Sequence, residues 1–299
     1  MLVTELWIYP IKSCRGLSLN AAQVSANGLK SGQWGDREMT IVDATGKFIT
    51  QRQYPQMAQI VVALNGEEIT LSSENVEIAP FTFKPTLNGQ KRTVEVWRDR
   101  VTAIDQGDTV ATWLQKALHL SHSVRLMRQT PQHPRLVDPH YAPTGQETVS
   151  FADAYPILLT NTASLADLNR RLEVKYQNTS QNVPMSRFRP NIVIEGETPF
   201  QESTWETLQI NTVQCRFVKP CSRCIVTTTD QITGKQNPQQ EPLKTLSTFR
   251  QFPHQGILFG ENLIPLNEGS MQIGDPISVV SEQKEIPQNQ SSEGLPEES

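Results

Sequence analysis

Long hydrophobic runs are missing from this 299-residue chain, and cysteine is scarce, with four residues. No segment approaches the roughly 20 consecutive apolar residues that a membrane-spanning helix needs. The N-terminus, MLVTELWIYPIKSC, lacks the charged leader and apolar run of a targeting segment. We therefore expect a cytoplasmic protein without membrane attachment. A chain of this length buries roughly 75% of its unfolded surface and needs no disulfides, so we expect its thiols to be free or to bind a ligand.

An excess of charge of either sign is also missing. The chain holds 27 basic and 31 acidic residues, a net charge of −4. Residues 282–299 contain five Glu and one Lys, which is also −4, so residues 1–281 are neutral. A neutral body argues against nucleic acid as a partner, because nucleic-acid-binding proteins usually carry a basic face. The tail at 282–299 is poor in apolar residues and is predicted to be disordered.

The sequence does hold many short β-strand patterns and a few helical ones. Strands are expected where β-branched and aromatic residues cluster between turn residues, at 2–9, 38–50, 93–105, 155–160, 191–196, 206–218 and 270–280. Helices are expected where apolar residues recur on one face, at 108–120, 161–176 and 242–252. The predicted fold class is mainly β (α+β). We divide the chain into a domain at 1–125, a connector or active-site loop at 126–150, a second domain at 151–281 and the tail.

The stretch KPCSRCIVTTTD, residues 219–230, contains two of the four cysteines, Cys221 and Cys224. A redox pair of the thioredoxin type needs its first cysteine at the start of a helix, whereas the β-branched run IVTTTD predicts a strand. A structural zinc site needs four ligands, but Cys14 and Cys215 are isolated and the five histidines show no ligand spacing. The cysteine spacing of a plant-type iron–sulfur site is missing as well. These interpretations are therefore disfavoured.

The remaining choice is between buried cysteines and a metal-binding thiolate. Cys215 lies in an alternating strand pattern and is predicted to be buried. Cys14 and Cys221 are also interpreted as structural. Cys224 differs because Arg223 is its direct neighbour, and a nearby cation favours the thiolate.

Four short motifs follow one another along the chain: YPIKSC, FRPNIVI, CSRCIVTTTD and GDPI, at residues 9–14, 188–194, 221–230 and 274–277. In this order they resemble the two-domain proteins with an N-terminal MOSC-type β-barrel and a C-terminal MOSC domain. That group includes the mitochondrial amidoxime-reducing component and its bacterial relatives. The resemblance covers residues 1 to about 281. It implies an N-terminal β-barrel-like domain and a C-terminal MOSC β-barrel with a few peripheral helices.

The resemblance also implies a molybdenum cofactor, in which the dithiolene of molybdopterin holds the metal and one protein cysteine supplies another sulfur. By position, that metal ligand and catalytic residue is Cys224. The implied cofactor contacts are Lys12, Ser13, Arg37, Asn161, Thr162, Arg189, Asn191, Ser222 and Arg223. The residue types suit this role, because Arg and Lys bind phosphate and a soft thiolate suits a heavy metal. Asn161 and Thr162 open a predicted helix, where free backbone N–H groups favour an anion.

The activity that the resemblance implies is that of an oxidoreductase: two-electron reductive cleavage of the N–O bond in small N-hydroxylated or N-oxide substrates. No Gly-x-Gly-x-x-Gly fingerprint of a flavin or nicotinamide site is visible, and only a short tail follows residue 281. We therefore expect an external electron donor, which would be a ferredoxin, a cytochrome or a flavin reductase. Asp230, His133 and His140 are candidate proton donors, and a bound water is an equal alternative.

Two other functions stay open. MOSC domains also form part of molybdenum cofactor sulfurases, and in that case Cys224 would relay a persulfide in sulfur transfer. Pyridoxal phosphate is not expected, because the chain has no room for the larger domain that binds it. In the other alternative, the chain would store or deliver the molybdenum cofactor as a binding protein. A cysteine persulfide without tightly held metal would favour sulfur transfer, and retained cofactor without N-reductive turnover would favour a carrier.

Overall fold

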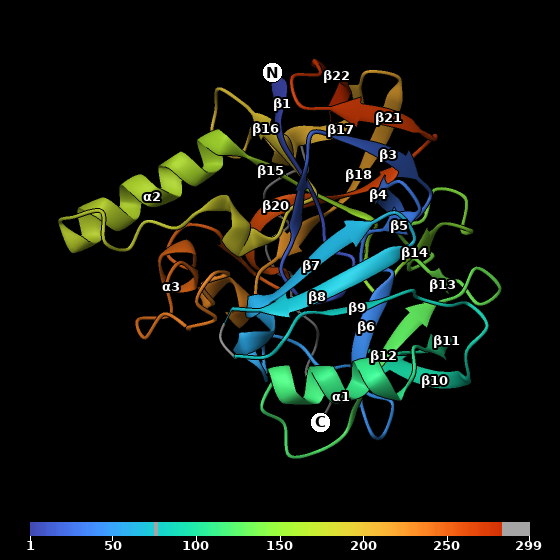
Figure 1. Ribbon diagram of the computed structural model, residues 1–299. Coiled ribbons are helices and arrows are strands. Elements are labelled where there is room, and N and C mark those ends of the chain that lie inside the picture. The colour runs from blue at the N-terminus through green and yellow to red at the C-terminus, as the bar shows by residue number, and fades with distance from the viewer. Residues whose placement is uncertain (75–76, 283–299) are drawn as a thin grey trace, which may run out of the picture.

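β-Strands make up most of the regular structure in the computed structural model, which describes residues 1–74 and 77–282 (Figure 1). The largest sheet has nine strands, and β19 (Gln251–Phe252) pairs with β20 at its side. The other eight follow the order β2 (Leu17–Leu19), β1 (Leu2–Ile8), β16 (Ile192–Glu195), β15 (Ile157–Asn161), β20 (Gly256–Pro265), β18 (Val213–Ser222), β17 (Trp205–Ile210) and β22 (Ile277–Glu282). The mainly β fold predicted from the sequence is confirmed.

Four smaller sheets complete the fold. One has the order β10 (Lys91–Val96), β11 (Asp99–Asp105), β12 (Val124–Gln129) and β6 (Met39–Asp43). A second has the order β21 (Gly269–Gln272), β3 (Ala21–Ser25), β4 (Gly28–Ser31) and β5 (Trp34–Gly35). The last two sheets contain β7 (Ile60–Asn65), β8 (Glu68–Ser73) and β9 (Phe81–Phe83), and the short pair β13 (Arg135–Leu136) and β14 (Thr148–Val149).

Helices are few and lie at the outside of the sheets (Figure 1). The α-helices of the described residues are α1 (Asp108–Ala117), α2 (Thr162–Tyr176) and α3 (Leu243–Leu246). Short 3₁₀ turns are η1 (Pro55–Gln59), η2 (Met185–Phe188), η3 (Gln201–Thr204) and η4 (Ile225–Thr228). On α1, Val110, Trp113 and Leu114 recur at helical spacing and pack into a buried core with residues of β6 and β12. The amphipathic pattern that predicts a helix here therefore also fixes the face that it buries.

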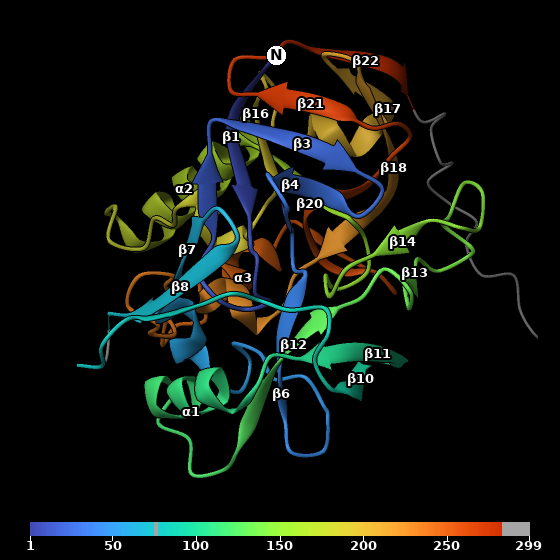
Figure 2. The same ribbon diagram turned by 45° about the vertical axis from the view of Figure 1, so that its right-hand side comes forward.

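The two ends of the sequence share sheets. β1 lies between β2 and β16 and pairs antiparallel with both, and β3 pairs with β21. Figure 2 shows the blue β3 beside the red β21. One buried core joins these elements, because Leu6 and Ile8 pack in the same cluster as Ile157 and Ile192. Paired strands and a common core thus cross the boundaries predicted at residues 125 and 150. Those boundaries divide the sequence and not the packing.

Three segments differ from the expectation. The run IVTTTD after the cysteine pair forms η4 rather than a strand, because the hydroxyls of Thr227 and Thr228 donate to backbone carbonyls three residues earlier. The strand expected at 206–218 is a hairpin of β17 and β18 that turns at Asn211, whose φ is +52°. The helix expected at 242–252 is limited to α3, and β19 follows it.

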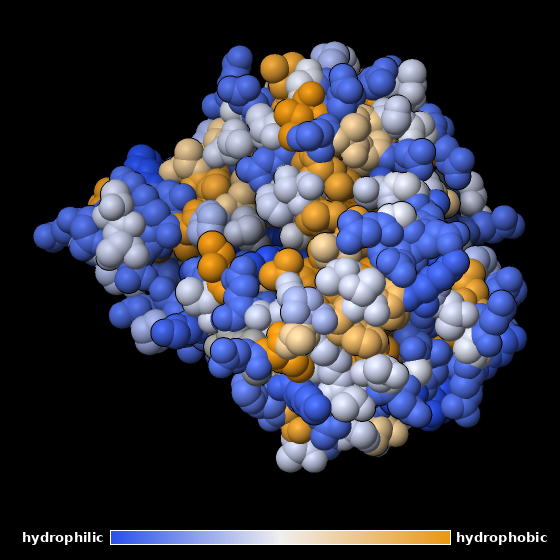
Figure 3. Space-filling model, in the orientation of Figure 1, coloured by the Kyte–Doolittle hydropathy of each residue, from blue (hydrophilic) through white to orange (hydrophobic). Residues whose placement is uncertain are grey.

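The surface is mixed in character. On the face in Figure 3, hydrophobic residues lie in scattered patches among hydrophilic ones. Within residues 1–74 and 77–282, no helix combines the length and apolarity that a membrane span requires. The tail predicted to be disordered, 282–299, lies outside the described residues except for Glu282, which ends β22.

Candidate functional site

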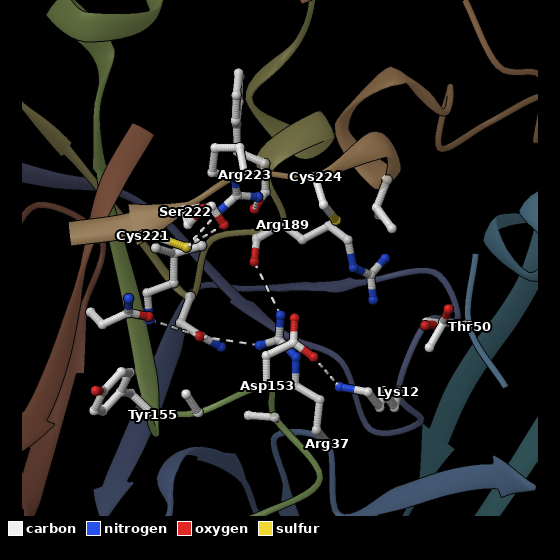
Figure 4. A pocket seen from close by; sticks show the side chains of 18 of the residues that line it. Lys12, Arg37, Thr50, Asp153, Tyr155, Arg189, Cys221, Ser222, Arg223 and Cys224 are labelled. Atoms are coloured by element: carbon white, nitrogen blue, oxygen red, sulfur yellow. Dashed lines mark hydrogen bonds and ion pairs between the residues drawn. The ribbon is translucent and has the colours of Figure 1, made fainter. Parts of the chain in front are cut away.

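A cleft of about 870 Å³, partly open to solvent, collects side chains from distant parts of the sequence (Figure 4). The cleft brings together most of the site residues proposed from the sequence: Lys12, Ser13, Arg37, Arg189, Asn191, Ser222, Arg223 and Cys224. Other polar and aromatic residues also line it, among them Thr50, Arg52, Trp97, Asp153, Tyr155, Cys221 and Asn262.

Strand pairing explains why these segments meet. β16 pairs antiparallel with β1 and parallel with β15, so the end of β1 and the starts of β15 and β16 lie at one edge of the sheet. Lys12 follows β1, Asp153 precedes β15 and Arg189 precedes β16. β18 ends at Ser222 and carries Cys221, with Cys224 just beyond it. The sheet order therefore brings four separate segments of the sequence together in one wall.

The backbone around the cleft is unusual. Ser13, Arg37, Trp97 and Arg189 have φ values of 66°, 49°, 56° and 54°, and they are four of the ten non-glycine residues with positive φ in the described chain. A side chain is crowded in this left-handed region, so such residues persist only where the surrounding contacts hold them. They gather at binding and catalytic sites. This concentration supports the cleft as the candidate site, and it does so independently of any motif.

Lys12 is buried in the cleft wall and is neutralised by Asp153, with 2.5 Å between Nζ and Oδ1. Burial lowers the pKa of Lys12, and Asp153 opposes this effect. The protein packed around Asp153 would raise the pKa of its carboxyl, but Lys12 and Arg37 outweigh that and hold this pKa well below its usual range. The Asp153 side chain is 68% exposed, so solvent screens part of the attraction.

Arg37 is held by three acceptors. Its Nη1 lies 2.6 Å from Oδ2 of Asp36 and donates to Oδ1 of Asn191 at 3.2 Å, while Nη2 donates to the carbonyl of Arg189 at 3.1 Å. Burial alone would lower the pKa of Arg37, and the carboxylate of Asp36 acts in the opposite direction. The net pKa is raised, so the guanidinium stays charged. Asn191 thus acts through Arg37, since its side-chain oxygen is used in holding that cation.

Arg189 keeps an N–H donor without a protein acceptor. Its Nη1 donates to Oε1 of Gln231 at 2.9 Å, whereas the buried Nη2 has no hydrogen-bond partner within the described residues. Burial lowers the pKa of Arg189 to about 10, so the group is protonated at neutral pH. A buried donor without an acceptor is destabilising. An anionic group in the cleft would relieve this cost.

The two cysteines of the CSRC motif lie in the same wall in different environments. Sγ of Cys221 lies 2.9 Å from Nη1 of Arg223, and burial raises the pKa of this thiol although Arg223 lowers it. Cys221 is therefore protonated at neutral pH, and it lines the cleft rather than a core. Figure 4 shows the thiol of Cys224 directed toward the side chain of Arg189. The wall thus offers two thiols, of which that of Cys221 lies beside Arg223.

Asn161 and Thr162 are not brought to the cleft. Asn161 is the buried N-cap of α2, where Oδ1 accepts from the backbone N–H groups of Ala163 and Gly196 at 2.9 and 3.1 Å. Its Nδ2 donates to Oε2 of Glu202 at 3.1 Å. The geometry does not support an anion at this helix start, because the asparagine already accepts from the free N–H of Ala163 and has no polar atom to spare. These two residues are left out of the site.

The proton donors suggested by the sequence also lie elsewhere. Asp230, His133 and His140 do not line the cleft, and Asp230 pairs with Arg187 at 3.1 Å. Cys215 is a free thiol buried in the core of the large sheet, and Cys14 is buried in the core beneath α1. Their predicted burial is confirmed.

Sequence reasoning missed Asp153, Trp97 and Arg52. Trp97 turns the hairpin of β10 and β11, and its Nε1 donates to Oδ1 of Asp153 at 3.3 Å. The guanidinium of Arg52 lies 4.4 Å from the centre of the Trp97 ring. No local pattern marks these residues, because they meet only through long-range packing. The one signal in the sequence is that Asp153 lies just beyond the connector or active-site loop at 126–150.

Comparison with known proteins covers nearly the whole chain. Residues 1–121 match the MOSC N-terminal beta barrel domain, and residues 146–278 match the MOSC domain. Mitochondrial amidoxime-reducing component 1 of Homo sapiens is 33% identical over 291 residues, 94% of this chain and 83% of that protein. Mitochondrial amidoxime reducing component 2 of Bos taurus is 32% identical over 284 residues, 92% of this chain and 82% of that protein. The chain therefore belongs to the family of two-domain MOSC proteins that contains the mitochondrial amidoxime-reducing components.

Proposed function

We propose that the chain is a molybdenum-cofactor-dependent oxidoreductase that reduces small N-hydroxylated or N-oxide compounds by two-electron cleavage of the N–O bond. One observation carries the proposal: the half-buried Cys224 shares a single cleft with five cations, Lys12, Arg37, Arg52, Arg189 and Arg223. The names of the relatives, amidoxime-reducing components, support the same class of reaction.

The groups in the cleft fit molybdopterin, which carries a phosphate and a polar ring. Nη2 of Arg189 and Nε of Arg223 are buried without a partner among the described residues, so acceptor atoms of a ligand would satisfy them. Ser13 and Ser222 add hydroxyl groups at the cleft wall, and Cys224 offers a soft sulfur. We assign the metal ligand to Cys224, the cofactor contacts to Lys12, Ser13, Arg37, Arg189, Ser222 and Arg223, and to Asn191 the holding of Arg37.

The protein groups bind, orient and protonate. When bound, the cofactor supplies the two-electron redox chemistry. For an N-hydroxylated substrate, the N–O bond breaks, the nitrogen gains an N–H bond and the oxygen leaves as water, which requires two electrons and two protons. Besides the cations, two neutral groups of the cleft keep their protons, the thiol of Cys221 and the hydroxyl of Tyr155, because burial raises the pKa of both. We propose these two as the groups that hold protons near the substrate.

The electrons come from another protein in this proposal. The word component in the names of the relatives fits a system of more than one protein. A ferredoxin, a cytochrome or a flavin reductase would supply them, and we propose the cytoplasm as the location.

The test is turnover of a simple amidoxime with an artificial electron donor, using protein produced in a host that makes the cofactor. We expect the wild type to form the amidine. We expect Cys224→Ser to lose more than about tenfold in rate, because a metal ligand is removed. Cys215→Ala serves as the control, because that cysteine lies in the core away from the cleft. A wild-type protein that holds metal and pterin but leaves a panel of N-hydroxylated compounds unchanged would contradict the reductase and favour a carrier.

A further inference from the structure

Two positive charges lie side by side in the cleft wall, although like charges repel. Nη2 of Arg37 donates to the backbone carbonyl of Arg189 at 3.1 Å, and the charge of Arg37 lowers the pKa of Arg189. Arg37 is neutralised by Asp36. Arg189 pairs with the neutral amide of Gln231 and, within the described chain, with no carboxylate. Something other than an ion pair must therefore offset the repulsion around Arg189.

Both guanidinium groups pack against the ring of Tyr9. Cζ of Arg37 lies 4.1 Å from the ring centre, and Cζ of Arg189 lies 4.2 Å from it. A guanidinium is attracted to the electron-rich face of an aromatic ring, and the attraction is stronger where water is excluded. Tyr9 is only 2% exposed, and burial raises its pKa to about 12, so the neutral ring and not a phenolate makes these contacts.

Contacts with neighbouring residues fix the position of the Tyr9 ring. Its hydroxyl donates to the carbonyl of Pro190 at 3.1 Å, and its backbone N–H donates to Oδ1 of Asp36 at 2.8 Å. Gly16 lies against the ring edge, where a Cβ would come within 2.5 Å of Cε1 of Tyr9. Contacts with Pro190 of the FRPN motif, with Asp36 and with Gly16 thus fix the ring, and the ring in turn positions both guanidinium groups.

From this arrangement we infer that Tyr9 is a positioning residue, which holds Arg37 and Arg189 ready for the anionic part of the cofactor although Tyr9 does not itself line the cleft. The inference rests on the proposed function. Holding two like charges together before binding removes the cost of assembling them at the moment of binding. The free Nη2 of Arg189 then meets its acceptor without rearrangement.

The test measures how fast the holoprotein releases its pterin after dilution, followed by pterin fluorescence. Tyr9→Phe keeps the ring and removes the hydroxyl, so we expect release within about twofold of the wild-type rate. Tyr9→Leu removes the ring, so we expect release about tenfold faster. A third protein carries a fluorinated phenylalanine at position 9, which keeps the shape of Phe but withdraws electrons from the ring face. Positioning by the ring predicts release at least about threefold faster than from Tyr9→Phe, whereas a purely structural role predicts the same rate.

Tyr176→Leu is the matched control. The ring of Tyr176 also contacts a cation, since Nζ of Lys175 lies 5.2 Å from its centre. Tyr176 does not line the cleft, so its loss is expected to leave the rate of pterin release unchanged. Should Tyr9→Leu fail to fold, the fluorinated protein decides the question alone. Equal release rates from Tyr9→Phe and its fluorinated counterpart would overturn the inference and leave the proposed function intact. A wild-type protein without any pterin would overturn both.

Discussion

Each of these buried cations of the cleft has a partner of its own, a carboxylate for Lys12 and Arg37 and an uncharged group for Arg189. Lys12 has the carboxylate of Asp153, Arg37 has Asp36, and Arg189 has a ring and an amide. A buried charge without such a partner is costly, so the partners matter as much as the cations. Changes at the partners should therefore be visible in stability, apart from any effect on chemistry.

At Asp153, we expect Asp153→Asn to lower the free energy of unfolding of the cofactor-free protein by about 1 kcal/mol at neutral pH, because Lys12 loses its counter-ion while solvent screens the pair. The loss should shrink as pH falls below about 4, because the Asp153 carboxyl of the unfolded chain takes up a proton there, whereas the folded carboxylate, whose pKa is depressed, does so only at lower pH. It should also shrink at alkaline pH, where Lys12 becomes neutral, since burial lowers its pKa. Urea unfolding at a series of pH values measures this.

The double variant Lys12→Met with Asp153→Asn is the control for that experiment. Removing both charges should recover most of the lost stability, because no unpaired buried cation remains. Equal losses in the single and double variants, or a loss that is independent of pH, would contradict the role given to the pair.

Sequence reasoning reached the residues that sit inside recognisable motifs. Cys224, Arg37 and Arg189 could be proposed because their neighbours carry the resemblance, and all three line the cleft. Asp153 and the ring contacts of Tyr9 could not, because they depend on where β15 and β16 start relative to β1. Residue type alone gave the wrong expectation at Asn161, whose polar side chain at a helix start is typical of an anion site but here makes the hydrogen bonds of the helix cap.

At the scale of elements, strong periodicity predicted well and local chemistry predicted poorly. The amphipathic pattern at 108–120 became α1, and the hairpin at 93–105 became β10 and β11. The β-branched run after Cys224 became η4, since threonine hydroxyls bonded to nearby carbonyls compete with strand pairing. Propensity alone does not report that competition.

The start of α2 allows a direct check of the corrected assignment. Asn161→Ala removes the cap of this helix and the contact with Glu202, so we expect a loss of about 2 kcal/mol in the free energy of unfolding. Molybdenum content per folded chain should stay at the wild-type level, because Asn161 does not line the cleft. A variant of normal stability that lost its molybdenum would restore Asn161 as a cofactor contact.

Strand β20 carries a second pH-dependent group. Glu261 is 3% exposed, and burial raises its pKa from 4.5 to about 8, although the hydroxyl of Ser203 donates to it at 2.7 Å. The folded protein therefore binds a proton between about pH 4.5 and 8 that the unfolded chain does not, so stability falls as pH rises through this window. We expect Glu261→Gln to flatten this slope and to be more stable than the wild type at pH 9 by on the order of 3 kcal/mol.

The exposed Glu206 on the neighbouring strand β17 provides the matched control for Glu261, because Glu206→Gln should leave the pH dependence as in the wild type. Thermal unfolding between pH 5 and 9 is the measurement. A slope that survives Glu261→Gln unchanged would assign the effect to other groups, with Glu202 the next to change, since burial raises its pKa as well.

At the scale of the whole molecule, the strands of the two sequence halves are interleaved. Sequence patterns predicted the β class and the order of elements, but not that β1 would lie between β2 and β16, because that pairing is set by packing between residues almost 190 positions apart, such as Leu6 and Ile192. The local pattern indicates that a segment is a strand and which of its faces is apolar. Which strands lie beside it in the sheet depends on the whole chain.

This interleaving predicts that the segments 1–125 and 126–282 do not fold separately. Each would expose an unpaired edge and half of a shared core, since β1 and β3 each have one partner strand, β16 and β21, that lies after residue 190. We expect narrow amide dispersion in nuclear magnetic resonance spectra of either segment alone, and folded protein when both are produced together. A well-dispersed spectrum from one isolated segment would contradict this prediction.

The central claim is that Cys224 supplies the one protein sulfur that holds the metal of a molybdenum cofactor in the cationic cleft. The most direct measurement is the molybdenum and pterin content of the wild type, Cys224→Ser and Cys215→Ala, all made in a host that synthesises the cofactor. We predict about one molybdenum per chain in the wild type and Cys215→Ala, and at least about a tenfold loss of metal in Cys224→Ser. Equal molybdenum in the wild type and Cys224→Ser would contradict the account.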